Sequence, residues 1–242
     1  MIKYSFIIPY YNRGKQFYNT LASLRYYYSR RGDCDAVVIE DSKNDDQLFS
    51  LVKLFEDDIK IRIIKTGRKD LYNPSPAYNA GVRAAIGEYV VLTSPECMHL
   101  NNVLGVFDNI FEAVPNSYTI AACMSGKKIK GVYHDPESVT YDRHMWYQHT
   151  VYRNLKYHFC SALKRVTYSA IGGFDERYAE GYCFDDDSFR DRVAAHGVPF
   201  VATDSAVVLH QEHPKQNVPK ALWERNKALY EAEQRAKQKD TA

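Results

Sequence analysis

SPAYNAGVRAAIGEYVVLTSPE, residues 75–96, predicts a helix followed by a strand that ends abruptly. Ser75 is a typical helix cap, the proline after it suits the first helical turn, and a glycine is typical of the helix end. The apolar run Tyr89–Thr93 predicts a buried strand, which Pro95 terminates. Glu96 places one carboxylate just beyond that strand, and the fold around it decides what the carboxylate can bind.

The same alternation of strand and helix continues on both sides of this stretch. Apolar runs predict further strands at 4–9, 36–40, 59–65 and 118–124. Apolar residues at helical spacing predict further helices at about 15–29, 47–56 and 102–113. Alternating elements are typical of an α/β protein whose mostly parallel sheet is covered by helices on both faces.

The pattern changes after residue 125. A polar, aromatic-rich stretch to about residue 158 predicts an irregular segment, and short strands are expected at 199–203 and 206–210. A charged helix is expected over about 219–239. The predicted organisation is one domain over 1–213, with halves 1–124 and 125–213, and a C-terminal helical extension over 214–242.

Composition limits the classes of partner. A chain of 242 residues with 45% hydrophobic residues can bury a sizeable core, and a net charge of +2 gives no basis for bulk attraction to nucleic acid. The five cysteines show no CxxC or metal-binding spacing, which suits a reducing compartment. No segment approaches the roughly 18–20 apolar residues that span a bilayer. We expect a cytoplasmic protein without a transmembrane segment, with peripheral membrane contact through the basic C-terminal helix left open.

The first strand–helix turn, PYYNRG, lies where ligands of such sheets bind, beyond the carboxyl end of a strand. It lacks both the GxGxxG pattern of dinucleotide sites and the GxxxxGK[ST] phosphate loop. A nucleotide here would depend on aromatic and carboxylate contacts. Tyr11 could stack on a base, and Asp41 could accept a hydrogen bond from a base or a ribose. Alternatively, Tyr11 packs under the helix and Asp41 caps a turn.

Glu96 has two interpretations. A glutamate after a strand commonly caps the next turn. A bound diphosphate, however, needs charge neutralisation, usually by Mg²⁺ or Mn²⁺, and these hard cations prefer carboxylate oxygens. Mn²⁺ also accepts imidazole, so a second ligand could be His210 or His213, although either histidine could be structural.

Three adjacent aspartates lie between aromatic residues in FDDDSF, residues 184–189. At a helix N-terminus such carboxylates gain from capping and from the helix dipole, which is the structural interpretation. The functional interpretation is that one of them is a general base for a hydroxyl nucleophile.

Together these segments resemble glycosyltransferases of family 2 with the GT-A fold, over about residues 4–213. Four segments carry the resemblance: FIIPYYNR at 6–13, VVIEDSKND at 37–45, PAYNAGVRAAIGEYVV at 76–91, and GGFDERY with FDDDSFRDRV within 172–193. The resemblance implies a Rossmann-like, mostly parallel sheet flanked by helices, with a smaller irregular acceptor-side half and a C-terminal helix.

The resemblance also implies an inverting transferase that uses a nucleotide-diphosphate sugar and acts on a hydroxyl of a glycan or other acceptor. On the donor side, in residues 1–124, Pro9 and Tyr11 would frame the base and Asp41 would bind the base or ribose. Arg68 is a looser candidate for the base or the diphosphate. UDP is the first choice of nucleotide, and GDP and dTDP stay open.

On the acceptor side, in residues 125–213, the resemblance implies that Asp186 is the general base and that Asp185 holds an acceptor hydroxyl. Trp146 is a candidate platform for an acceptor sugar, because an aromatic face suits the apolar face of a sugar. It could equally be a tryptophan that docks the second half of the chain.

The sequence departs from the family where an Asp-x-Asp motif is usual, because this chain has Thr93-Ser94-Pro95 there. The hypothesis is that Glu96, with His210, binds Mn²⁺ or Mg²⁺. The family's frequent arginine in the preceding helix is here Tyr78, so one positive contact to phosphate is missing or comes from elsewhere.

Two other classes of function stay open. The degenerate metal motif fits a nucleotide-sugar or glycan-binding protein without turnover. A sugar-phosphate nucleotidyltransferase would require a Gly-rich, basic first loop, and PYYNRG with the residue after it supplies only Arg13 and Lys15.

Overall fold

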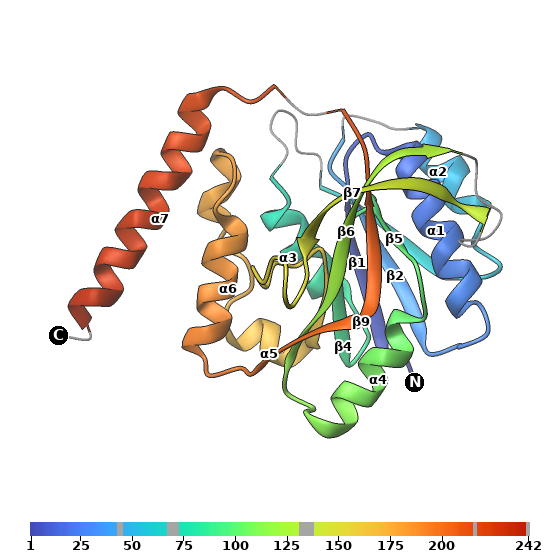
Figure 1. The fold of residues 1–242 in the computed structure, drawn as a ribbon, viewed down its shortest axis with the longest axis horizontal. Coiled ribbons are helices and arrows are strands. Elements are labelled where there is room, and N and C mark those ends of the chain that lie inside the picture. The colour runs from blue at the N-terminus through green and yellow to red at the C-terminus, as the bar shows by residue number, and fades with distance from the viewer. Residues whose placement is uncertain (43–45, 67–72, 131–137, 215–216, 241–242) are drawn as a thin grey trace.

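The computed structural model describes residues 1–42, 46–66, 73–130, 138–214 and 217–240. Within these residues one sheet of nine strands forms the centre of the molecule (Figure 1). The strands are β1 Tyr4–Tyr10, β2 Cys34–Glu40, β3 Lys60–Lys65, β4 Tyr89–Thr93, β5 Cys97–His99, β6 Tyr118–Lys130, β7 Thr140–Gln148, β8 Cys160–Lys164 and β9 Phe200–Gln211.

The strand order is β3-β2-β1-β4-β8-β6-β9-β5, and β7 pairs with β6 outside this path. The strands from β3 to β4 are mutually parallel, as is the pair β6–β9. The pairs β4–β8, β6–β8, β5–β9 and β6–β7 are antiparallel. The predicted mostly parallel α/β sheet is therefore confirmed over the first four strands in chain order, with a mixed sheet beyond.

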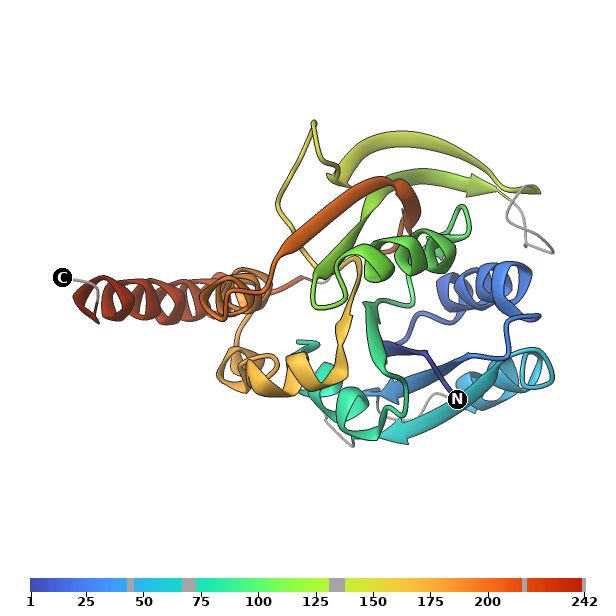
Figure 2. The same cartoon turned by 90° about the horizontal axis from the view of Figure 1, so that it is seen from below.

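Helices cover both faces of the sheet (Figures 1 and 2). They are α1 Gly14–Tyr28, α2 Asp46–Lys53, α3 Ser75–Ala84, α4 Val103–Ala113, α5 Arg165–Ala170, the 3₁₀ helix η2 Glu176–Glu180, α6 Asp185–Ala195 and α7 Lys220–Asp240. Along β1, Phe6 and Ile8 pack in a core with α1, α2 and α4, whereas Ile7 packs in a second core with α3, α5 and α6. This alternation follows from the period of two along a strand, and it makes β1 apolar on both faces.

The boundaries of the helix in 75–96 differ from the prediction. Ser75 is the first helical residue and Pro74 is its cap, while Asn73 Oδ1 accepts a hydrogen bond from the Ser75 amide at 3.0 Å. The helix ends at Ala84, because Ala85 is already extended. Gly87 therefore does not terminate the helix; it lies against the backbone of β1, where a Cβ would come 2.6 Å from the Ser5 nitrogen.

The second half of the chain is more regular than predicted. The stretch expected to be irregular contains β7, and β6 extends to Lys130 to pair with it. The two short strands expected at 199–203 and 206–210 are one strand, β9, with a register shift against β6. Bulges in β6–β7 and the polar, exposed surface of β7 disturb the alternation of polar and apolar residues, which explains why the pattern did not reveal this ribbon.

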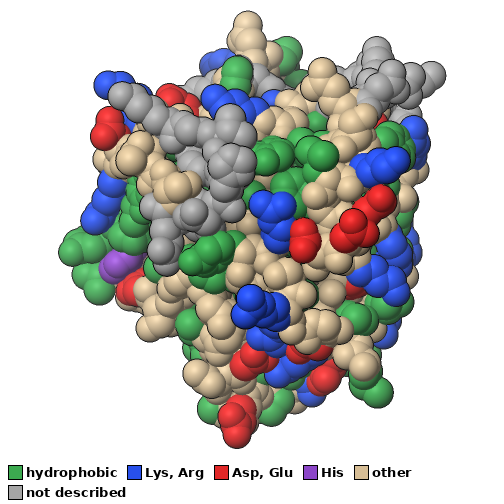
Figure 3. Space-filling view, turned by 90° about the vertical axis from the view of Figure 1, so that its right-hand side faces the viewer, with side chains coloured by type: hydrophobic (Ala, Val, Ile, Leu, Met, Phe, Trp, Pro, Cys, Tyr) green, Lys and Arg blue, Asp and Glu red, His purple; other side chains and the backbone are tan. Residues whose placement is uncertain are grey.

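Positive and negative side chains are interspersed on the face shown in Figure 3. This distribution agrees with the small net charge of the chain. Among the described residues, no helix combines the length and the apolar character needed to cross a membrane.

Candidate active site

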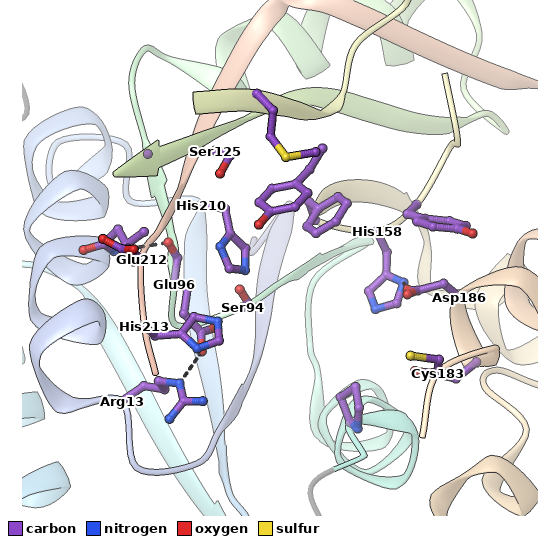
Figure 4. A pocket seen from close by; sticks show the side chains of 18 of the residues that line it. Arg13, Ser94, Glu96, Ser125, His158, Cys183, Asp186, His210, Glu212 and His213 are labelled. Carbon is purple, nitrogen blue, oxygen red and sulfur yellow. Dashed lines mark hydrogen bonds and ion pairs between the residues drawn. The ribbon is translucent and has the colours of Figure 1, made fainter. Parts of the chain in front are cut away.

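A cavity of about 820 Å³ lies at the carboxyl ends of β1 and β4, between the β6–β7 ribbon and the start of α6. Two groups of polar residues face each other across it (Figure 4). One group is Arg13, Glu96, His210 and His213; the other is His158, Cys183 and Asp186. The topology explains this meeting, because ligand sites on such sheets form beyond the carboxyl ends of the strands.

Asp186 lies in the first turn of α6, and its side chain is 37% exposed. The Nδ1 atom of His158 lies 2.8 Å from Oδ1 of Asp186. The His158 ring is buried and makes edge contacts with the rings of Tyr78 and Phe174, at centroid distances of 4.8 and 4.7 Å. This packing fixes the imidazole, so it can hold the carboxylate of Asp186 in one direction.

The two neighbouring aspartates have different environments. Asp185 is buried, and this burial raises its pKa to about 7, with the negative charge of Asp186 adding to the effect and His158 opposing it. Asp187 is engaged by the hydroxyl of Tyr157, which donates to its Oδ1 at 2.7 Å, and by Arg190 at 3.1 Å. Asp185 and Asp186 line the cavity.

Glu96 follows the end of β4 and is tied to β9 by the Gln211 amide, which donates to the Glu96 carbonyl at 2.9 Å. Its carboxylate is not free: Arg13 Nε donates to Glu96 Oε1 at 2.8 Å. Arg13 comes from the turn between β1 and α1 and lines the same cavity, so a basic side chain lies beside the predicted metal ligand.

His210, in β9, stands opposite Cys97 in the register of β5 and β9 and is therefore near Glu96. Burial lowers the pKa of His210 to about 4, although the charge of Glu96 opposes that shift. A neutral imidazole and a carboxylate suit Mn²⁺, so the chemistry of Glu96 and His210 fits a cation. No cluster of three or more potential metal-binding side chains occurs within the described ranges, so a metal here would need further ligands from the substrate or from water.

The predicted nucleotide residues lie at a different part of the same sheet edge. Asp41 is buried beyond β2, and its amide donates to the Tyr10 carbonyl at 3.0 Å; its Oδ1 accepts a hydrogen bond from the Thr66 hydroxyl. Pro9 is buried within β1, and Tyr11 is partly exposed just after it. These residues are near one another, because β1, β2 and β3 are parallel and in register. Arg68 lies outside the described residues.

The structure does not bring Trp146 to the cavity. His144, Met145 and Tyr147 of β7 line the cavity. Trp146 instead packs between Arg143, 4.6 Å from its ring centroid, and His149, 4.5 Å between centroids. Other aromatic side chains line the cavity, among them Tyr147, Tyr157, Phe159 and Tyr182.

Sequence reasoning did not identify His158 as a partner of Asp186 or Arg13 as a partner of Glu96. The signal for Arg13 was present, since it ends the FIIPYYNR segment at the carboxyl edge of the first strand. No sequence motif marks His158, because it contacts Asp186 only through packing between segments far apart in the chain.

Comparisons with known proteins agree with this architecture. The family model for glycosyl transferase family 2 matches residues 5–171. The crystal structure of S. aureus TarS 1-349 in complex with UDP-GlcNAc has a TM-score of 0.69 at 14% identity, covering 89% of this chain and 60% of that one. The mannosyltransferase PcManGT from Pyrobaculum calidifontis, in complex with GDP-Man and Mn²⁺, has a TM-score of 0.61 at 17% identity, covering 89% of this chain and 58% of that one.

At these identities the likeness shows a shared fold, that of the GT-A glycosyltransferases. The chain spans about 60% of the length of the TarS 1-349 structures. No curated protein matches the sequence.

Proposed function

Because the chain belongs to glycosyl transferase family 2, we propose that it is an inverting transferase that moves a sugar from a nucleotide-diphosphate donor to a hydroxyl group. The observation that carries this proposal is the cavity itself. It combines a carboxylate suited to be a base, Asp186, with a facing group of Arg13, Glu96 and His210 suited to a diphosphate. UDP is the preferred nucleotide, in line with the TarS complex with UDP-GlcNAc, and the PcManGT complex with GDP-Man makes GDP the alternative to test.

On the donor side we assign the base and ribose to Pro9, Tyr11 and Asp41. These residues surround the carboxyl ends of β1 and β2, where a base can stack on Tyr11 and donate to Asp41. The first half of the domain, residues 1–124, thus supplies most of the donor contacts. His210, from residues 125–213, would complete the diphosphate end.

Glu96 and His210 would hold Mn²⁺ or Mg²⁺, which would neutralise the charge that develops on the departing diphosphate. Arg13 would bring a second positive charge to this end, because its guanidinium lines the same cavity, where it lies beside Glu96. Together with the neutral imidazole of His210, this side of the cavity would orient the diphosphate away from Asp186.

On the acceptor side, Asp186 would take the proton of the acceptor hydroxyl as its oxygen attacks the anomeric carbon from the face opposite the diphosphate. The new carbon–oxygen bond forms as the bond to the diphosphate breaks. His158 would hold the Asp186 carboxylate toward the hydroxyl, and Asp185 would contact a second acceptor oxygen. We place the acceptor ring against Tyr147 rather than Trp146, because Tyr147 lines the cavity.

The test is a transfer assay with UDP-, GDP- and dTDP-sugars, with Mn²⁺ present, against a panel of glycan acceptors. Released nucleoside diphosphate is quantified, and the anomeric configuration of the product is read by NMR. The proposal expects inversion, and it expects Asp186→Asn to lose transfer by about 10²–10⁴-fold while UDP binding is retained.

Asp187→Asn is the matched control in the same helical turn, because its carboxylate is occupied by Tyr157 and Arg190; we expect a smaller loss. Transfer retained by Asp186→Asn would exclude Asp186 as the base. A product with retained configuration would exclude the inverting mechanism, and binding of nucleotide sugars without turnover would favour a binding protein.

A further inference from the structure

The C-terminal helix α7 packs beside α6 and the segment that leads into it (Figures 1 and 2). Glu233 of α7 accepts hydrogen bonds from the Tyr178 hydroxyl at 3.0 Å and from the Ser188 hydroxyl at 3.1 Å. Tyr230 donates to Asp191 of α6 at 2.8 Å. These contacts reach both ends of residues 178–191, so α7 is docked on the segment that carries Asp185 and Asp186.

Asn226 is the most buried polar residue of this interface, with 0% of its surface exposed. Its Nδ2 donates to the Tyr178 carbonyl at 3.0 Å and to the Cys183 carbonyl at 2.9 Å. Its Oδ1 accepts from Arg225 Nη1 at 3.0 Å. Both amide protons are thus used to join two carbonyls of residues 178–183, and a buried carbonyl that loses such a donor is costly. The Tyr178 carbonyl has a second donor, the Gly181 amide at 3.1 Å.

The loop approaches α7 more closely than a side chain would permit. A Cβ on Gly181 would lie 2.1 Å from Asn226 Oδ1 and 2.8 Å from the Leu222 carbonyl oxygen. The next amide, of Tyr182, donates to that same Leu222 carbonyl at 3.1 Å. The backbone of residues 181–182 therefore packs directly against the backbone of α7.

The residues just before α6 have a strained backbone. Cys183 and Phe184 have φ values of 63° and 67°, which residues with a side chain rarely adopt. Two consecutive left-handed residues persist only where the surroundings hold them. Here Asn226 holds the Cys183 carbonyl, and the Phe184 ring lies 5.5 Å from Trp223 of α7 between centroids.

We propose that α7 is a clamp on the loop of the catalytic base and that Asn226 is a positioning residue for Asp186. This inference rests on the proposed function, in which Asp186 takes the proton. The strained residues Cys183 and Phe184 directly precede Asp185 and Asp186, so a relaxed loop would turn the first turn of α6 away from the cavity. The contacts that prevent this come from a helix outside the 5–171 segment that matches the family.

The test compares Asn226→Ala with Arg235→Ala, an exposed position on the same helix. We expect kcat to fall about 100-fold in Asn226→Ala, since a displacement of about 1 Å at a reacting group has an effect of this size. The KM for the donor and the calorimetric affinity for UDP should stay unchanged, because the proposed donor residues come from the ends of β1, β2 and β4 and from β9, and none belongs to the 178–191 segment that α7 contacts. Arg235→Ala should have the same kcat, donor KM and UDP affinity as the wild type.

Hydrogen exchange gives a readout that needs no substrate. In Asn226→Ala the amides of residues 178–187 should exchange faster, while those of β1 and β4 keep their protection. If the wild type transfers no sugar, the proposed function fails, and this measurement still decides whether the clamp exists. If Asn226→Ala does not fold, Gly181→Ala disturbs the same contact from the loop side and should give the same loss of kcat and faster loop exchange. A folded Asn226→Ala or Gly181→Ala with full kcat and unchanged exchange would overturn the proposal.

Discussion

The Nδ1 atom of His158 lies 2.8 Å from Oδ1 of Asp186, although His158 precedes β8 and Asp186 lies in the first turn of α6. The imidazole is buried and makes edge contacts with the stacked rings of Tyr78 and Phe174, which leaves it little freedom to turn. The pair therefore links the core beneath α3 to the carboxylate that we propose as the base.

Replacing His158 with phenylalanine keeps a flat ring against Tyr78 and Phe174 but removes the nitrogen that faces Asp186. We expect kcat for sugar transfer to fall about 100-fold, because the carboxylate loses the partner that directs it. Affinity for UDP, measured by calorimetry, should not change. His196→Phe is the control, since His196 is exposed at the end of α6; equal losses in the two variants would contradict a specific role for His158.

Burial of Asp185 predicts that the protein loses stability as the pH rises. Its pKa is about 7 in the folded protein, compared with an ordinary value of 3.8, so the folded state holds a proton that the unfolded state has lost. The stabilisation is fully present below pH 3.8 and disappears as the pH rises through 7. Asp185→Asn stays neutral, so at pH 8 it should exceed the wild type in free energy of unfolding by roughly 2–4 kcal/mol.

Urea denaturation at several pH values tests this prediction. The difference between the two proteins should shrink toward zero as the pH falls toward 4. Asp57→Asn, at an exposed position, serves as the control and should show no such trend. A constant difference between Asp185→Asn and the wild type across this range would mean that Asp185 is already ionised in the folded protein at low pH.

Removal of the Glu96 carboxylate tests the metal assignment. If Glu96 and His210 hold the cation, Mn²⁺ should tighten UDP binding by at least about tenfold, or about 1.4 kcal/mol, in the wild type and not in Glu96→Ala. Calorimetric titration of UDP with and without Mn²⁺ measures the difference, and Glu112→Ala, exposed on α4, is the control. Equal UDP affinity with and without Mn²⁺ in the wild type would leave Arg13 as the main partner of Glu96 and of the diphosphate.

The sequence predicted the first half of the fold well, because each buried strand is a continuous apolar run between helices with a clear apolar face. β1 and β2 are buried along their whole length, and each has an uninterrupted apolar stretch at its centre, FIIP at 6–9 and AVVI at 36–39. β7 was missed for the opposite reason: five of its nine residues are exposed, and its pairing with β6 is interrupted by bulges. Local pattern therefore carries little information about a ribbon that is held by one neighbour.

In the candidate site, too, the residues that lie in local motifs could be predicted, and those that depend on distant contacts could not. Asp185, Asp186, Glu96 and His210 could be named because they lie in recognisable motifs or at strand ends, and all four line one cavity. His158 and Asn226 could not be named, because their roles depend on packing between segments distant in the sequence. Trp146 was proposed for its chemistry, but its ring packs against Arg143 and His149 and does not line the cavity.

Gly87 offers a test of how closely the segment 75–96 is fitted to β1. A Cβ at Gly87 would lie 2.6 Å from the Ser5 nitrogen and 2.8 Å from the Tyr4 carbonyl carbon, both backbone atoms that cannot rotate away. The Gly87 amide also donates to Ser5 Oγ at 2.9 Å, and that hydroxyl donates to Asp35 at 2.5 Å, so a displaced Gly87 would disturb a buried polar chain. We expect Gly87→Ala to lower the free energy of unfolding by about 1–3 kcal/mol, the usual effect of overpacking.

Gly14→Ala is the matched control for this substitution, because its Cβ would meet the Tyr10 hydroxyl at 3.6 Å, an ordinary contact. Urea denaturation of both variants at one pH measures the difference. Gly87→Ala should shift the midpoint to lower urea without changing the slope, since the unfolded chains expose the same surface. Equal midpoints for Gly87→Ala and Gly14→Ala would show that β1 and the start of β4 can move apart with no loss of stability. The close packing of Gly87 would then not contribute to the position of Glu96.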